Sequence, residues 1–133
     1  LLSIYGAAMI RTYNMTAIIH AVGNTRIYRK EILKKFGVNH CHYLCENPQK
    51  LPTNKADIVI ETCGDRNSVK TGLEMLNIGG HIILTGLVHS DSLLNISGEK
   101  IVRKLGTIEG IHNYRLRDFE DSVNWLETNY HAF

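Results

Sequence analysis

The chain has 133 residues, of which 44% are apolar and 21% charged, so it is long enough to bury a core. Fifteen basic and thirteen acidic residues leave a net charge of +2 without a basic stripe, so nothing in the composition supports nucleic-acid binding. Three cysteines without disulfide-like spacing indicate a reducing compartment, and we expect the cytoplasm. The apolar first ten residues are too few to span a bilayer and lack signal-peptide features, so no membrane association is expected.

The first elements in chain order are two helices and two strands. Residues 1–15 predict a helix with an inner side made by Leu2, Gly6, Met9 and Tyr13. Residues 17–22 predict a strand, and residues 25–36 an amphipathic helix that Gly37 stops. A weaker strand is predicted at 40–44. Because the chain starts with Leu1 directly in helical periodicity, we expect a piece of a longer protein, truncated at its N-terminus.

Residues 56–89 read as strand, helix and strand. The run DIVI predicts a strand buried on both faces, and Asp65 or Asn67 can cap the helix that follows. Gly79-Gly80 is expected to stop this helix, and residues 81–84 predict the next strand. Parallel strands joined by a helix end at the same edge of the sheet, which is where ligands of open α/β sheets bind.

The remainder predicts a short helix at 98–104, a strand at 107–111 and an amphipathic helix at 116–130, capped near Arg117-Asp118. Helical spacing assigns Phe119, Trp125 and Tyr130 to the core. The alternation of strands and helices predicts one α/β domain over residues 1–133, with a doubly wound, mostly parallel sheet of the Rossmann type.

Five motifs in order resemble the coenzyme domain of zinc-type, medium-chain alcohol dehydrogenases. They are LLSIYGAAMIRTYNMTAIIHAV, RKEILKKFGVNH, ADIVIETCG, LEMLNIGGHIILTGL and IVRKLGTIEGIHNY. The segment GTIEGIHNYRLRDFEDSVNWL is most similar to the branch of these enzymes that is associated with phosphonate catabolism. The resemblance covers essentially the whole chain.

The resemblance implies an NADP- or NAD-dependent dehydrogenase of alcohols or polyols, in which a catalytic zinc acts on a small alcohol. Zinc is expected only in a separate catalytic domain, so no catalytic or metal-binding residue is assigned within this chain. The first strand and the glycine-rich phosphate loop are expected to precede the chain, with the third glycine of the loop at Ser3. A chain that lacks both this loop and the catalytic domain is expected to be a poor catalyst by itself.

The family positions that line the coenzyme can be carried over one by one. The resemblance places Leu2 and Ser3 at the phosphate-binding helix start, and Thr62 and Cys63 beside the adenosine half. It places Thr85, Gly86 and Leu87 at the nicotinamide ribose and carboxamide, and Ile111 and His112 beside the nicotinamide. His112 is assigned a positioning or packing role rather than proton transfer.

One departure from the family concerns the end of the strand predicted at residues 17–22, which corresponds to the family's second strand. The carboxylate that binds the adenosine ribose in NAD-dependent members is replaced by Val22, which Gly23, Asn24, Thr25 and Arg26 follow. Asn24 and Thr25 can form hydrogen bonds, and Arg26 can meet a 2′-phosphate. We therefore predict a preference for NADP, although Arg26 also fits a solvated residue at a helix start.

Two rival functions remain. The segment LEMLNIGGHIIL also resembles a SAM-dependent methyltransferase, but that class needs an antiparallel hairpin at the end of its sheet. The other rival is a non-catalytic Rossmann module. In dehydrogenases of the family, two subunits pair through the sixth strand of the sheet, which corresponds to residues 107–111 here. A homodimer through Gly106 to Tyr114 is therefore expected.

Other residues that bear chemistry are assigned ordinary structural roles. His40, Cys41, His42 and Cys45 resemble a zinc site by residue type, but Cys41 points away from His40 and His42 on a strand. Cys63 lacks a neighbouring base, so a nucleophilic role is not expected. Glu61 can cap or pair locally. His20 and His81 have no partner that the sequence identifies.

Overall fold

The computed structural model describes residues 2–24, 30–45, 51–88 and 93–132, and the statements below concern these residues. Contacts divide the chain into two compact units, Leu1–Lys50 with Asn113–Phe133 and Leu51–His112, and each is described by itself. None of the described helices combines the length and apolarity needed to cross a membrane.

The first unit contains α1 (Leu2–Tyr13), β1 (His20–Gly23), α2 (Lys30–Lys35), β2 (His40–Tyr43), α5 (Leu116–Asn129) and the 3₁₀ turn η2 (Tyr130–Ala132). The second unit contains β3 (Ala56–Glu61), α3 (Arg66–Met75), β4 (Leu76–Leu84), α4 (Gly98–Lys104) and β5 (Thr107–Gly110).

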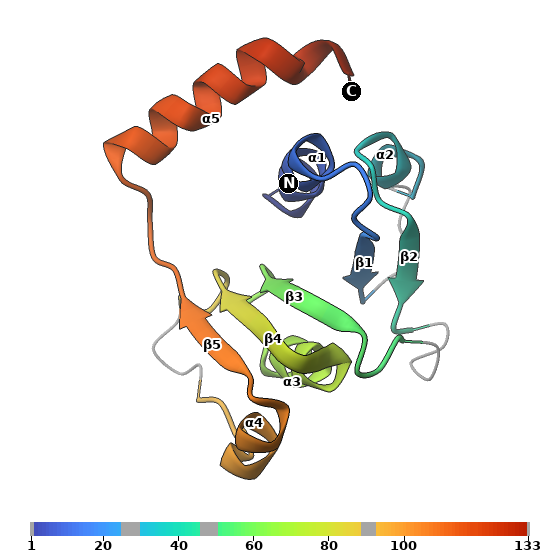
Figure 1. Ribbon diagram of the computed structural model, residues 1–133, viewed down its shortest axis with the longest axis vertical. Coiled ribbons are helices and arrows are strands. Elements are labelled where there is room, and N and C mark those ends of the chain that lie inside the picture. The colour runs from blue at the N-terminus through green and yellow to red at the C-terminus, as the bar shows by residue number, and fades with distance from the viewer. Residues whose placement is uncertain (1, 25–29, 46–50, 89–92, 133) are drawn as a thin grey trace. The chain divides into compact units, whose positions relative to one another are not determined.

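Every described strand pairing is parallel. In the first unit β1 pairs with β2, and in the second unit the order is β3-β4-β5 (Figure 1). The doubly wound strand order is 3-2-1-4-5-6, in which the pair 3-2 and the triplet 4-5-6 are neighbours. The two hydrogen-bonded groups match this pair and this triplet, and the predicted α/β class with parallel strands is confirmed.

The core of the first unit includes small residues of α1. Ala7 and Ala8 are buried, whereas the predicted inner residues Leu2 and Tyr13 are exposed, so the predicted face was wrong. Side chains without a Cγ let a helix backbone approach its neighbours closely. The predicted strand at 17–22 is also shorter than expected, because β1 begins only at His20.

Arg11 joins α1 to the turn that ends α2. Its guanidinium donates from Nη2 to the carbonyl of Gly37 at 2.9 Å and to Oδ1 of Asn39 at 2.7 Å. It also donates from Nη1 to the carbonyl of Met15 at 2.6 Å. Gly37 has a φ of +86°, which confirms the left-handed end predicted for this helix.

The second unit is built on the strand–helix–strand segment. The carboxylate of Asp65 caps α3 by accepting hydrogen bonds from the N–H groups of Asn67 at 3.0 Å and Ser68 at 3.1 Å, as one of the two predicted caps. The helix ends at Met75, so the prediction that Gly79-Gly80 would stop it was wrong. Leu76 has extended backbone angles and begins β4, and the left-handed Gly79 lies before the point where β4 pairs regularly with β3.

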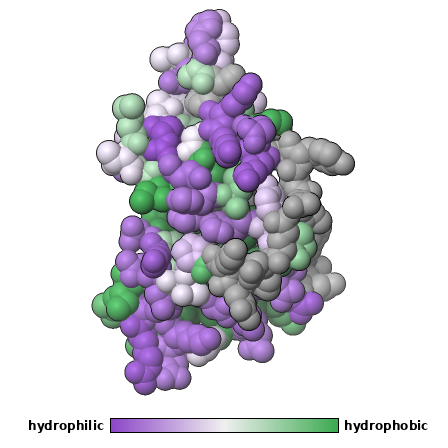
Figure 2. Space-filling view, turned by 90° about the vertical axis from the view of Figure 1, so that its right-hand side faces the viewer, coloured by the Kyte–Doolittle hydropathy of each residue, from purple (hydrophilic) through white to green (hydrophobic). Residues whose placement is uncertain are grey.

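The prediction that β3, the strand with the run DIVI, is buried on both faces was also wrong. Ile58 is 63% exposed and Ile60 is 45% exposed, whereas Val59 and Glu61 point to the covered face. The helix α3 packs on β3 and β4 and covers a single face. Figure 2 shows that apolar residues occupy separate patches among predominantly hydrophilic ones on the side that it presents.

The short helix α4 matches its prediction at both ends. Ser97 is its N-cap and accepts from the N–H of Lys100 at 3.4 Å. Leu105 ends the helix in a left-handed conformation with φ of 50°, and β5 starts at Thr107 as predicted.

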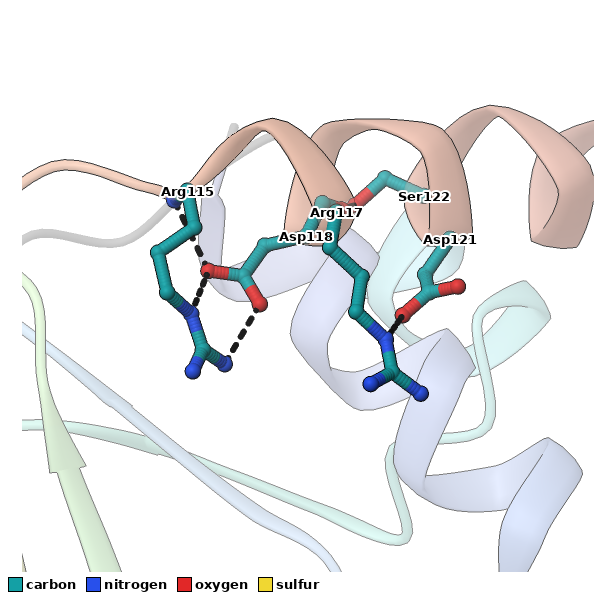
Figure 3. A network of polar contacts seen from close by, with 5 residues as sticks. All are labelled: Arg115, Arg117, Asp118, Asp121 and Ser122. Carbon is teal, nitrogen blue, oxygen red and sulfur yellow. Dashed lines mark hydrogen bonds and ion pairs between the residues drawn. The ribbon is translucent and has the colours of Figure 1, made fainter.

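The helix α5 begins at Leu116 as predicted, but its N-cap is Arg115 rather than the predicted Arg117-Asp118. Asp118 accepts from the backbone N–H of Arg115 at 2.9 Å and from its guanidinium at 2.9 and 3.1 Å (Figure 3). These hydrogen bonds hold the pKa of Asp118 at about 2. Only Trp125 among the predicted aromatic core residues is buried; Phe119 and Tyr130 are 53% and 59% exposed, because no described element covers their side of the helix.

Candidate functional site

Three strand ends of the second unit lie at one edge of its sheet. The register aligns Glu61 of β3 with Leu84 of β4, and Leu84 with Gly110 of β5. The residues that follow these positions are those that the sequence assigned to the coenzyme: Thr62 and Cys63, then Thr85, Gly86 and Leu87, then Ile111 and His112. The structure therefore brings seven of the twelve assigned residues to one edge.

Glu61 organises the first of these strand ends. Its side chain is buried, and Oε1 accepts from the N–H of Cys63 at 2.8 Å, the N–H of Gly64 at 2.9 Å and Oγ of Ser68 at 2.6 Å. Three donors on one carboxylate fix the turn after β3 to the first turn of α3. The local pairing expected for Glu61 is confirmed, but the sequence did not indicate that it holds the whole turn.

Two glycines let the ends of β3 and β4 meet backbone to backbone. Gly64 has a φ of +77°, and a Cβ on it would collide with the carbonyl of Gly86. A Cβ on Gly86 would in turn collide with the amide of Gly64 and would lie 2.7 Å from the carbonyl carbon of Thr62. Any side chain at either position must therefore displace one of the two loops.

Glu61 and Thr85 join the same two strand ends through one main-chain and one side-chain hydrogen bond. The N–H of Thr85 donates to the carbonyl of Glu61 at 2.9 Å, and its hydroxyl donates to the same carbonyl at 2.8 Å. At the third strand end, the N–H of Ile111 donates to the carbonyl of Leu84 at 3.0 Å. The edge is thus one connected backbone surface rather than three separate loops.

The second strand end has donors that no described part of the chain uses. Within the described residues, the N–H groups of Gly86 and Leu87 form no hydrogen bond, although both residues are half-buried. Partly buried amides of this kind are available to acceptor groups of a ligand. They match the backbone contacts that the resemblance assigns to this loop.

The remaining assigned residues belong to the first unit. Leu2 and Ser3 form the start of α1, and Asn24 follows the carboxyl end of β1 and is exposed. Thr25 and Arg26 lie outside the described residues. Of the three residues predicted to lie near a 2′-phosphate, the structure therefore describes only Asn24.

Imidazoles gather on one face of the β1–β2 pair. Nδ1 of His20 lies 2.9 Å from Nε2 of His42, and the His20 ring stacks on that of His40 with centroids 4.7 Å apart. Burial, together with the charges of neighbouring imidazoles, lowers the pKa of His20 and His42. His20 therefore has a partner that sequence reasoning missed, because it arrives from a strand 22 residues earlier than His42.

The described residues contain no group of side chains that could bind a metal ion. No three His, Cys, Asp or Glu side chains there are placed to hold a metal ion. Cys41, Cys45 and Cys63 are free thiols, and burial raises the pKa of Cys41.

Comparison with protein families decides the affiliation. The sequence model of the family described as zinc-binding dehydrogenase matches residues 3–128. The chain belongs to the zinc-binding dehydrogenase family. The resemblance stated from the sequence motifs is confirmed, whereas a search of curated proteins gave no match.

Solved structures show the same fold as this zinc-binding dehydrogenase chain. An alcohol dehydrogenase from Thermotoga maritima superposes with a TM-score of 0.84 at 17% identity, over 98% of this chain and 38% of that one. Benzyl alcohol dehydrogenase from Acinetobacter calcoaceticus gives 0.77 at 18% identity, over 95% and 36%. YhdH of Escherichia coli K-12, solved with bound NADPH, gives 0.71 at 19% identity, over 97% and 41%. The chain thus spans well under half the length of each of these proteins.

The direction of the last strand separates the family from the methyltransferase alternative. β5 runs parallel to β4, and the part of the chain that the structure describes contains no antiparallel strand pair. The hairpin expected at the end of a methyltransferase sheet is therefore not found in these residues, and the family match agrees with the dehydrogenase interpretation.

Proposed function

We propose that this chain is the coenzyme-binding part of an NADP- or NAD-dependent alcohol or polyol dehydrogenase. The observation that carries the proposal is the connected edge formed by Glu61, Gly64, Thr85 and Gly86 at the carboxyl ends of parallel strands. Ligands of open α/β sheets bind at this edge. Membership of the zinc-binding dehydrogenase family supplies the chemical class.

The residues present fit a nicotinamide dinucleotide. The unused N–H groups of Gly86 and Leu87 would bind the nicotinamide ribose or carboxamide, and Thr62 and Cys63 would lie beside the adenosine half. Ile111 and His112 would limit the space beside the nicotinamide. The coenzyme, when bound, supplies the hydride acceptor or donor, and these residues supply its placement.

Zinc enters this proposal only through a catalytic domain outside the chain. Zinc in such a domain supplies Lewis-acid chemistry at an alcohol oxygen. The task of the present residues is to hold the nicotinamide in a fixed orientation and to keep the strand-end loops rigid.

A matched pair of glycine substitutions tests the coenzyme site. Gly86→Ala places a methyl group against the Gly64 backbone, whereas Gly98→Ala places one that meets no atom within 4 Å beyond the adjacent residues and the backbone of its own helix. Calorimetric titration of the full-length protein with NADPH is expected to show at least roughly tenfold weaker binding for Gly86→Ala and unchanged binding for Gly98→Ala. Equal affinities in both variants would contradict the proposed site.

The coenzyme preference is a separate proposal. We infer that Asn24, Thr25 and Arg26 favour NADP, since no carboxylate follows β1 and an arginine can pair with a 2′-phosphate. Competitive titration should show that NADP⁺ binds more tightly than NAD⁺ and that Arg26→Ala removes most of the difference. Arg117→Ala, on the exposed side of α5, is the control, and tighter binding of NAD⁺ by the unmodified protein would refute the inference.

The outer edge of the second sheet supports a proposed homodimer. In the described residues β5 pairs with β4 on one side only. Its other edge can therefore pair with the same segment of a second copy, between Gly106 and Tyr114. Sedimentation analysis over rising protein concentration should show a dimer. A monomer at every concentration would rule this interface out.

A further inference from the structure

A groove in the second unit lies away from the strand-end residues assigned to the coenzyme. It has a volume of about 650 Å³ and runs between α3 and α4, over the start of β4 and β5. Small-molecule sites in proteins have volumes of roughly 300 to 1,000 Å³. None of the residues that line the groove is among those assigned to the coenzyme.

The walls of the groove are apolar. The side chains come from both helices, from the sheet and from the segment before α4: Val69, Leu73, Leu76, Leu94, Ile96, Ile101 and Ile108. Leu76 and Val69 are almost completely buried and form its rigid part. An apolar wall of this kind favours a hydrocarbon portion of a ligand.

The charged side chains that line the groove are mostly cations. They are Arg66, Lys70, Lys100, Arg103 and Lys104, together with one carboxylate, Glu74. Arg66 and Lys70 lie one turn apart on α3, and Lys100, Arg103 and Lys104 share α4. Both helices therefore present positive charge to the same space.

Two of these cations are already engaged. Arg103 forms an ion pair with Glu99 at 2.7 Å. Lys104 donates from Nζ to the carbonyls of Leu73 at 2.7 Å and Leu76 at 2.6 Å, and so caps the carboxyl end of α3. This contact holds α4 against α3 and keeps the groove open between them.

The other three cations form no ion pair within the described residues, although the carboxylate of Glu74 lines the same groove. No hydrogen bond or ion pair engages the side chains of Arg66, Lys70 and Lys100 in the portion of the chain that the structure describes. Burial and the nearby charge of Lys100 lower the pKa of Lys104, and the carboxylate of Glu74 opposes this shift without cancelling it. An anion in the groove would relieve this accumulation of positive charge.

We propose that the groove binds a single-chain amphiphile with an anionic head group, of the fatty-acid class. The hydrocarbon chain would lie along the partly exposed Leu73, Leu94 and Ile101, and the head group would meet the unpaired cations at the rim. Arginine binds a carboxylate or phosphate through two parallel hydrogen bonds, and lysine contributes a point charge. This site goes beyond the dehydrogenase function and does not depend on it.

Calorimetric titration with dodecanoate, below its micelle concentration, tests the site on the full chain. Dodecanoate and dodecyl phosphate should both bind, and dodecanol, which has the same chain without the charge, should bind roughly tenfold more weakly. Equal binding of dodecanol and dodecanoate would overturn the role assigned to the cations.

Charge-reversal variants locate the binding. Lys100→Glu should weaken dodecanoate binding roughly tenfold, whereas Lys35→Glu on α2 makes the same change of net charge at an exposed residue that does not line the groove and should leave binding unchanged. Urea unfolding of both variants checks that each is folded. Equal losses in the two variants would refute the site.

The same titrations separate this proposal from the coenzyme site. NADPH affinity should be unchanged in Lys100→Glu, and dodecanoate affinity unchanged in Gly86→Ala. If dodecanoate binding is instead lost in Gly86→Ala and retained in Lys100→Glu, the amphiphile binds at the strand-end edge and the groove proposal is wrong. A failure of NADPH to bind at all would leave the amphiphile result standing.

Discussion

Removal of the Glu61 carboxylate is expected to loosen the turn that joins β3 to α3 at the strand-end edge. Glu61 is 5% exposed and accepts hydrogen bonds from Cys63, Gly64 and Ser68. In Glu61→Ala these donors lose their acceptor, and each unpaired buried donor costs about 1 to 3 kcal/mol. Water reaches part of this turn, so we expect the free energy of unfolding to fall by about 3 kcal/mol.

Two milder variants are expected to lower the free energy of unfolding by less than Glu61→Ala. In Glu61→Gln the amide oxygen can replace Oε1, but the amide NH2 takes the place of Oε2, which accepts from the N–H of Gly64 at 3.2 Å, so the loss is about 1 to 2 kcal/mol. In Ser68→Ala one donor is removed while two N–H groups still satisfy the carboxylate, again at about 1 kcal/mol. Glu61→Ala should therefore be clearly the most destabilising of the three.

Urea unfolding followed by far-UV circular dichroism measures the stabilities. Amide hydrogen exchange adds a local measurement, because exchange at Cys63, Gly64 and Thr85 should accelerate in Glu61→Ala. If Glu61→Ala costs no more than Ser68→Ala, or if exchange at these amides does not change, the carboxylate does not hold the turn.

Three further outcomes follow from the packing and the titratable groups. Gly72→Ala should lower the unfolding free energy by about 1 to 3 kcal/mol despite the better helix propensity of alanine, because its methyl would lie 2.9 Å from Cγ1 of Val59; a higher urea midpoint would contradict this. His20 and His42 have a lowered pKa when folded, so the unfolded chain binds more protons and stability should fall as the pH drops from 7 through 6.5 and below. Replacement of both by Gln should flatten that dependence in thermal unfolding, and an unchanged slope would exclude these imidazoles as its source. Asp118 should titrate by NMR near pH 2, so its ion pair stabilises the start of α5 above its ordinary pKa of 3.8 and is lost as the pH falls through about 2; a midpoint near 3.8 would refute the contact.

Local sequence signals were sufficient for most elements and for the positions of the strand ends to which the coenzyme is proposed to bind. Gly98–Lys104 was predicted with both ends correct, and the structure adds Ser97 as its N-cap, a signal that acts within a few residues. The strand ends at Thr62 and Thr85 were likewise visible, since a β-branched run followed by glycine marks where a buried strand stops. The parallel topology then required these ends to share an edge.

Errors arose where distant segments determine burial. Ile58 and Phe119 have the periodicity of core residues, but burial depends on whether another element covers them, and none of the described elements does. The early end of α3 has the same origin. Leu76 leaves the helix to pack in the sheet beside Ala56, and the left-handed Gly79 only completes the turn.

The sequence by itself determined the α/β class, the order of the elements and the residues at the strand ends, because each rests on periodicity or turn chemistry within about ten residues. Tertiary structure alone decided that Gly64 and Gly86 touch, that His20 meets His42, and that Lys104 reaches the end of α3 from 31 residues away. Such contacts join segments that no local pattern relates, and they turn a row of strand ends into the connected edge that we propose as the coenzyme site.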